Sequence, residues 1–174
     1  NMLEICTDIT ERKDLFAKNG TEVKKQVDAA RARVNQRNLE GKKAPTVVFL
    51  RASASGIKAK GSYGNVGGEM LADLGCINIA DDDNSLLDNL SMEAIIAANP
   101  DFIFVTTQGN DTDAVQQNIE ETLLNNPAWN KLNAVKQGRY FILDKELYNL
   151  KPNARWGEAY QKLADILYGE EQAE

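Results

Sequence analysis

The 174-residue sequence predicts an α/β fold, a three-layer α/β/α sandwich with a mostly parallel central sheet, preceded by a long helix. Three continuous apolar runs, at 47–50, 102–105 and 140–143, lack the alternation of half-buried strands. They therefore predict strands that are covered on both faces, as in a parallel sheet. Amphipathic helical patterns separate these runs, and strands that alternate with helices indicate α/β layering.

The composition excludes several other classes of protein. Hydrophobic residues make up 43% and charged residues 26%, which is the balance of a globular chain. No apolar run approaches the roughly 20 residues that span a bilayer. A net charge of −6 argues against a duplex-binding domain with a dominant basic face. The absence of histidine excludes Ser-His-Asp and Cys-His nucleophile systems and most zinc sites.

Residues 10–38 are expected to form one long helix. Its apolar residues recur at helical spacing and form a single stripe, namely Phe16, Val23, Val27, Ala30 and Val34. Most of the other positions are charged or carry amides, which indicates a solvated opposite face. Thr10 is the expected N-cap, and Gly20 is expected to weaken or bend the helix.

Strands and helices then alternate along the chain. The first strand, at 47–50, is followed by a weaker one at 77–80 and by those at 102–105 and 140–143. The helical patterns lie at 66–74, 92–98, 112–124 and 155–168. Ser91 is the expected N-cap of the second of these helices, and Asn99-Pro100 is expected to end it.

The segments that follow the strands carry the candidate binding residues, because ligands of an open parallel sheet meet the loops at the carboxyl ends of its strands. The loop expected over 51–65 is small and polar and carries three cations and one aromatic ring. Shorter loops are expected over 106–111 and 144–155. The candidate ligand-binding residues are Ser53, Ser55, Lys58, Lys60, Tyr63, Thr107, Gln108, Tyr148, Lys151 and Arg155.

Nucleotide and metal motifs are absent from these loops. Gly56 and Gly61 have the spacing of Walker A glycines, but Ser62 follows Gly61 with no lysine between them. The run 81–83 is all aspartate but lacks the glycine and the twelfth-position glutamate of a calcium loop. A solvated acidic turn is therefore favoured, and no metal site, catalytic residue or cofactor is assigned. A flexible Gly/Ser loop without a ligand is the alternative interpretation of 51–65.

Three segments together resemble a known family. Residues 67–80 (GGEMLADLGCINIA), 90–105 (LSMEAIIAANPDFIFV) and 126–140 (NPAWNKLNAVKQGRY) occur in the order of that family's motifs. The sequence resembles the substrate-binding proteins of ABC importers for iron-siderophore complexes, haem and cobalamin. Cys76 stands where the family usually has a second glycine, and the lack of histidine removes one common haem ligand.

The resemblance implies two α/β lobes joined by a rigid helix, with the ligand held between them. Residues 1–9 would be a remnant of an N-terminal lobe, 10–38 the linking helix and 39–174 the C-terminal lobe. The resemblance further implies an extracytoplasmic, non-enzymatic protein, lipid-anchored at full length and monomeric when intact, that delivers an iron complex to an ABC permease dimer. The Ser-x-Glu motif assigns the docking contact with that permease to Glu93.

The sequence leaves the ligand and two other functional classes open. Cations at 51, 58, 60, 151 and 155 would suit an anionic ferric chelate or haem propionates, unless they are solvated or paired with acids. Tyr63 and Tyr148 are expected to face one groove, and the alternative is that both rings only pack over the loop bases. The other classes are a small α/β enzyme or nucleotide-binding regulatory domain, and a pure interaction module. Cys6 and Cys76 are expected to be two buried free thiols, and a disulfide bond between them is the alternative.

Overall fold

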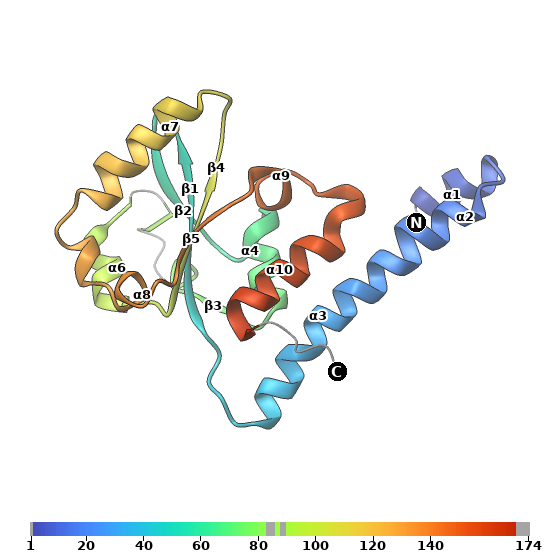
Figure 1. Cartoon of the computed structure of the whole chain (residues 1–174), viewed down its shortest axis with the longest axis horizontal. Coiled ribbons are helices and arrows are strands. Elements are labelled where there is room, and N and C mark those ends of the chain that lie inside the picture. Colours follow the sequence, from blue (N-terminus) through green and yellow to red (C-terminus); the bar gives the residue numbers. More distant parts are fainter. Residues whose placement is uncertain (1, 83–85, 88–89, 170–174) are drawn as a thin grey trace. The chain divides into compact units, whose positions relative to one another are not determined.

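A computed structural model describes residues 2–82, 86–87 and 90–169 of the chain (Figure 1). The chain divides into two units, one comprising residues 1–42 and 152–174 and the other residues 43–151. Among the described residues, no helix combines the length and the apolar character needed to cross a membrane. The proposed assignment of 1–9, 10–38 and 39–174 to a lobe remnant, a linking helix and a lobe stays a prediction.

The first unit is helical. Its main elements are α1 (Met2–Ile9), α2 (Lys13–Phe16), a π-helical turn (Ala17–Thr21), α3 (Glu22–Leu39) and α10 (Trp156–Tyr168). Helix α3 packs against α10, with Ala30 fully buried and with Val27 and Val34 half-buried on the predicted stripe. Arg33 joins the two helices through an ion pair of 2.5 Å with Asp165.

The long helix begins later than the sequence predicted. Thr10 is not its N-cap, because the Thr10 hydroxyl donates to the Cys6 carbonyl at 2.8 Å and so belongs to the end of α1. Glu11 then takes a left-handed conformation with φ of 57°, which separates α1 from α2. The helical hydrogen-bond pattern widens around Gly20 into the π-helical turn, at the position where a weakened helix was expected.

The second unit is built on a five-stranded sheet. Its strands are β1 (Thr46–Ser53), β2 (Gly56–Lys60), β3 (Ile77–Asn78), β4 (Phe102–Thr107) and β5 (Tyr140–Leu143). The strand order is β2-β1-β4-β5, with β3 also paired to β1. Three of the four pairings are parallel, and the β1–β2 pairing is antiparallel. The predicted mostly parallel sheet is therefore confirmed.

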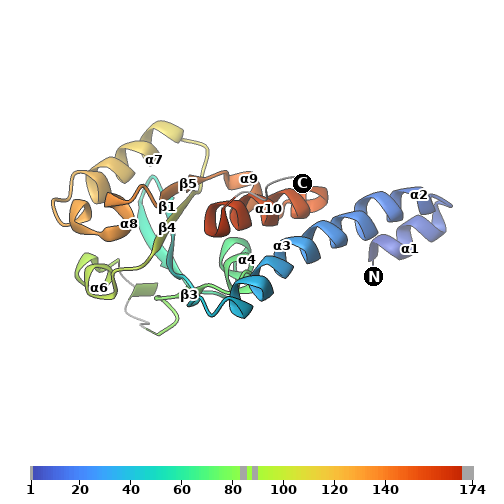
Figure 2. The same ribbon diagram turned by 60° about the horizontal axis from the view of Figure 1, so that its bottom comes forward.

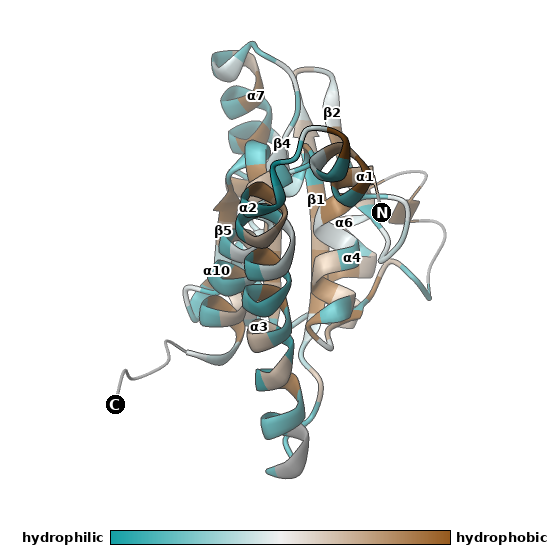
Figure 3. Ribbon diagram, turned by 90° about the vertical axis from the view of Figure 1, so that its right-hand side faces the viewer, coloured by the Kyte–Doolittle hydropathy of each residue, from teal (hydrophilic) through white to brown (hydrophobic). Residues whose placement is uncertain are grey.

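Helices cover both faces of this sheet. They are α4 (Val66–Asp73), α6 (Met92–Ala98), α7 (Thr112–Ile119), α8 (Asn133–Lys136) and α9 (Lys145–Tyr148). Helices α6, α7 and α8 lie on one face and α4 and α9 on the other (Figures 1 and 2). The three-layer prediction is confirmed for this unit. Figure 3 shows the hydrophobic colour of β1 and the mostly hydrophilic surface of α3.

Strand β1 has apolar side chains on both faces of the sheet, as the continuous run 47–50 predicted. Val48 and Leu50 join the core under α6 and α7, together with Ile103 and Val105 of β4. Phe49 points to the opposite face, where α4 crosses it at Gly67. Burial on both sides explains why the run shows no polar alternation.

Helix starts are fixed by side-chain caps. The predicted cap Ser91 accepts a hydrogen bond from the Ala94 backbone N–H at 3.2 Å, and Asn65 accepts one from Gly68 at 2.8 Å. Asp111 and Asp144 cap α7 and α9 in the same way. Asn99, in a left-handed conformation, ends α6 where the sequence predicted.

The segment 51–65 is not one loop, which corrects the sequence-based expectation. Strand β1 continues to Ser53, and β2 returns antiparallel beside it, with Ser53 opposite Gly56. Ile57 and Ala59 alternate inward to the core cluster, whereas Lys58 and Lys60 occupy the intervening positions. Only two inward residues alternate with the lysines, and one of them is an alanine, so this short strand resembled a polar loop in the sequence.

Gly67→Ala is expected to destabilise the second unit, because an added Cβ would clash with the buried Phe49 ring. Overpacking of this kind costs about 1–3 kcal/mol of unfolding free energy, measurable by urea denaturation. Phe49→Leu is the matched partner in a double-mutant cycle. The added methyl should cost less in the Phe49→Leu background, and equal costs in both backgrounds would contradict this packing.

Candidate functional site

Three cations share one face of the β1–β2 hairpin. Arg51 lies directly opposite Lys58 in the antiparallel register, and Lys60 lies two residues beyond Lys58 on the same strand. Their neighbours Leu50 and Ala59 belong to the core on the opposite face. Because side chains alternate along strands, the three cations lie together on one side of the hairpin.

No carboxylate among the described residues forms an ion pair with these three cations. Half-burial lowers the pKa of Lys60 first of all, and the positive charges of Arg51 and Lys58 lower it further. Like charges directly opposite each other across strands are destabilising. The hairpin therefore carries three positive charges that form no ion pair with an acid of the described residues, although the carboxylate of Asp81 lines the same hollow as Lys60.

Three adjoining hollows run along this hairpin, with volumes of about 530, 390 and 360 Å³. Arg51 lines the first two, and Ser53, Ser55 and Gln108 line the second and third. Because neighbouring hollows share these residues, we call their combined lining the hairpin groove. Its further members include Lys58, Lys60, Gly61, Tyr63, Gly64, Asn65, Asp81, Leu87, Leu90 and the 108–111 turn.

Side-chain hydrogen bonds to the backbone fix the turn between β2 and α4. Asp81 Oδ1 accepts a hydrogen bond from the Ser62 backbone N–H at 2.7 Å. Asn65 Nδ2 donates to the Gly61 carbonyl at 2.8 Å while its Oδ1 caps α4. Tyr63, at the tip of this turn, is 83% exposed and lines the groove beside Lys60. The turn thus fixes the backbone and leaves the ring accessible.

The structure brings most of the predicted binding residues together. Six of them line the hairpin groove, namely Ser53, Ser55, Lys58, Lys60, Tyr63 and Gln108. Thr107, the last residue of β4, is half-buried and lines none of its three hollows.

The expected pairing of Tyr63 with Tyr148 in one groove is wrong. Tyr148 is only 3% exposed and ends α9 on the face opposite α7, and it lines none of the three hollows. A buried tyrosine ring contributes apolar contact area, and α9 holds the Tyr148 ring in such a buried position. Lys151, just beyond, is exposed and also lines none of these hollows.

Arg155 belongs to the first unit and already binds an acid. Its guanidinium donates to both carboxylate oxygens of Glu158, at 2.7 and 2.9 Å. Hydrogen bonds from Arg155 and then Lys162 lower the pKa of Glu158 to about 2. Arg155 is therefore a cation neutralised by an acid of the helix that it precedes, which is the alternative that the sequence left open.

Sequence reasoning missed the polar frame of the groove. Asn65 and Asp81 both line it and both hold its backbone. The asparagine before the helical residues Val66-Gly67-Gly68 is an N-cap signal that would have pointed to Asn65. No local pattern links Asp81 to Ser62, because their contact joins residues 19 apart.

Glu93 lies where the sequence placed it, in the first turn of α6 after the cap Ser91. Its side chain is exposed, and its Oε2 accepts a hydrogen bond of 3.3 Å from the Ser91 hydroxyl. No cation of the described residues forms an ion pair with it. Glu93 thus presents an accessible carboxylate on the outer side of α6.

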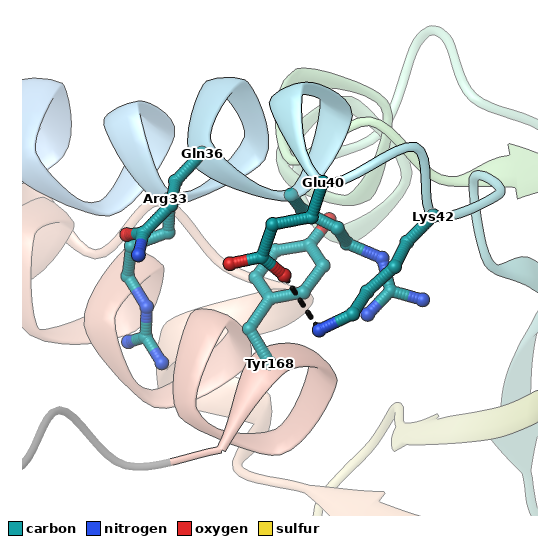
Figure 4. A pocket seen from close by; sticks show the side chains of 6 residues that line it. Arg33, Gln36, Glu40, Lys42 and Tyr168 are labelled. Atoms are coloured by element: carbon teal, nitrogen blue, oxygen red, sulfur yellow. Dashed lines mark ion pairs between the residues drawn. The ribbon is translucent and has the colours of Figure 1, made fainter.

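The first unit contains a separate polar hollow of about 190 Å³, drawn in Figure 4. Its cations contact groups of their own unit. Lys42 lies 2.6 Å from Glu40 and lowers the pKa of that carboxyl, and Arg37 lies over the Tyr168 ring at 5.3 Å. Arg33 is bound to Asp165, so this hollow is a weaker candidate than the hairpin groove.

No group of three or more acidic or sulfur ligands in the described part of the chain could hold a metal ion. Of the acidic run 81–83, residue 83 lies outside that part. Cys76 is buried and Cys6 is exposed, so the expectation of two buried thiols is wrong for Cys6. Neither of these two residues forms a disulfide bond.

The sequence profile of the family described as periplasmic binding protein matches residues 1–147. The chain therefore belongs to the periplasmic binding protein family, whose members are extracytoplasmic. No curated protein sequence matches the chain.

Solved structures agree with this assignment. An ABC transporter substrate-binding protein from Listeria monocytogenes EGD-e is 25% identical, with a TM-score of 0.64 over 94% of this chain and 64% of that one. The periplasmic haem-binding protein RhuT from Roseiflexus sp. RS-1 is 23% identical, with a TM-score of 0.70 over 93% of this chain and 59% of that one. Staphylococcus aureus IsdE, complexed with haem, is 18% identical, with a TM-score of 0.64 over 96% and 64%. The chain thus spans less than two thirds of the length of these structures.

Lys58→Gln is expected to raise the pKa of Lys60, because it removes one of the two positive charges that lower that pKa. The titration of the Lys60 side chain, followed by ¹⁵N-resolved NMR, measures this shift. Lys136→Gln, which changes an exposed lysine at the end of α8, is the matched control and should leave Lys60 unchanged. An unchanged Lys60 pKa in Lys58→Gln would show that these cations do not interact.

Proposed function

We propose that this protein is the substrate-binding component of an ABC importer and captures an iron complex, a ferric siderophore or haem. The observation that carries the proposal is the hairpin groove, in which three cations that form no ion pair with an acid among the described residues line two adjoining hollows. A cationic hollow of this kind suits the carboxylates, catecholates or propionates of such ligands.

The family and the likenesses support this function. Among the similar structures, three are named as haem-binding or haem-bound proteins, and another belongs to an Fe³⁺-hydroxamate transport system from Saccharomonospora viridis. Structural similarity at this level of identity supports the fold alone. The proposed ligand class of this chain is therefore argued from the residues of its hairpin groove. In the proposed protein, residues 39–174 form one lobe, a second lobe closes over the ligand, and a lipid anchors the monomer outside the cytoplasm.

Within this function, Glu93 docks the lobe onto basic residues of the permease dimer. An exposed carboxylate in a first helical turn is oriented by the helix and stays available to a partner. The capping hydroxyl of Ser91 fixes the start of that helix, so the carboxylate has a defined position. Ligand capture and permease docking thus use different side chains of the same unit.

Glu93→Arg is expected to separate the two activities. Affinity for the ferric complex should stay within about threefold, less than the tenfold step that corresponds to about 1.4 kcal/mol. Uptake by cells, and the ATP hydrolysis that the protein stimulates, should fall about tenfold or more, because the reversed charge repels a basic permease surface. Equilibrium binding and transport assays on the same variant measure both.

Glu146→Arg is the matched control, because Glu146 is another exposed acid in the first turn of a short helix, but on the opposite face of the sheet. It should leave both binding and uptake unchanged. Unchanged uptake together with collapsed ligand binding in Glu93→Arg would place Glu93 in the ligand site and overturn the docking role.

A further inference from the structure

We infer that the hairpin groove selects multiply anionic aryl chelates, of the ferric tris(catecholate) kind, over uncharged chelates such as ferric tris(hydroxamate). This inference rests on the proposed function and narrows its ligand class. It comes from the number, spacing and surroundings of the cations on the hairpin.

The three cations together carry more positive charge than one anionic group neutralises. Cross-strand neighbours such as Arg51 and Lys58 have Cβ atoms about 4.5–5.5 Å apart. Lys58 and Lys60 are two residues apart on one strand, or about 6.6 Å along it. The three side chains therefore start from separate points on one face of the hairpin, and a ligand with several negative charges can contact each of them.

Replacing water by an uncharged ligand would destabilise these three positive charges. Filling the groove removes water from the half-buried Lys60 and from Arg51, which costs free energy unless the ligand replaces that solvation. The lowered pKa of Lys60 reports that its surroundings already disfavour the positive charge. An anionic ligand supplies the missing countercharge, and Arg51 can also bind it through two parallel hydrogen bonds.

The remaining lining favours aromatic rings on the ligand. Tyr63 offers an exposed face next to Lys60, and Leu87 and Leu90 give the groove apolar walls. Offset stacking on a tyrosine is favourable for a flat ring. Catecholate groups combine a flat ring with negative charge, whereas hydroxamates bring neither to the uncharged complex.

The test measures binding of three probes to the 174-residue chain by equilibrium dialysis. The probes are a ferric tris(catecholate), a ferric tris(hydroxamate) and metal-free citrate, each at low and at high salt. The catecholate complex should bind at least about tenfold more tightly than the hydroxamate complex. Added salt should weaken binding of the catecholate complex and of citrate, because it screens charges beyond the Debye length of about 10 Å at 0.1 M.

Lys58→Gln should lower the affinity for the catecholate complex about tenfold and leave the hydroxamate complex unaffected. Lys136→Gln, the matched control, should change neither. The thermal midpoint of ligand-free Lys58→Gln should be equal to or above that of the unmodified protein, since the change relieves repulsion. If that variant does not fold, the salt dependence of the unmodified chain decides in its place.

The outcomes separate this inference from the proposed function. Equal affinity for both ferric complexes, unaffected by salt or by Lys58→Gln, would overturn the inference and leave the proposed function standing. Haem binding, followed by absorbance on the same chain, decides the proposed function where neither ferric chelate binds. Haem binding without binding of the ferric chelates would overturn the inference and leave the proposed function standing. Binding of neither haem nor a ferric chelate would overturn both, and citrate binding alone would then leave only an anion site.

Discussion

The second unit depends on one strand. Strand β1 pairs with β2, β3 and β4, and its residues Val47 to Leu50 are 0–1% exposed. A strand buried on both faces is stable only where helices cover both sides, and this forces the layered arrangement. The same strand sets the site, because its first polar side chain beyond this buried run, Arg51, follows Leu50 directly at the edge of the core.

Close packing around β1 also positions the groove. Helix α4 approaches the Phe49 ring at Gly67, where any larger residue would push it away. Its cap Asn65 fixes the turn that carries Tyr63, and Asp81 holds the other side of that turn. A fixed backbone beneath the side chains proposed to contact the ligand would reduce the ordering cost of binding. The position of α4 against β1 therefore determines both the packing of the core and the position of the turn that lines the groove.

The sequence predicted the features that depend on strong local patterns. The apolar runs, the Ser91 cap and the exposed Glu93 all follow from residues close together in the chain. The hairpin was missed because Ile57 and Ala59 form too weak an alternation between lysines. The burial of Tyr148 was missed because it is set by the packing of α9, which no local pattern shows.

The groove likewise depends on tertiary contacts. It needs the contact between Asp81 and Ser62 and the β1–β2 register, and neither is visible in a single sequence. Six predicted residues still lie in the groove, because β2 and its flanking turns continue from the carboxyl end of β1, and Gln108 follows the carboxyl end of the parallel strand β4. The proposed ligand class rests on the three hairpin cations, which form no ion pair with an acid of the described residues.

NMR mapping with the diamagnetic gallium tris(catecholate) complex tests this proposal most directly, because it reports the binding site residue by residue. We expect the largest amide shifts on Arg51, Lys58, Lys60 and the turn around Tyr63, whereas shifts centred on the hollow that Figure 4 draws would contradict the assignment.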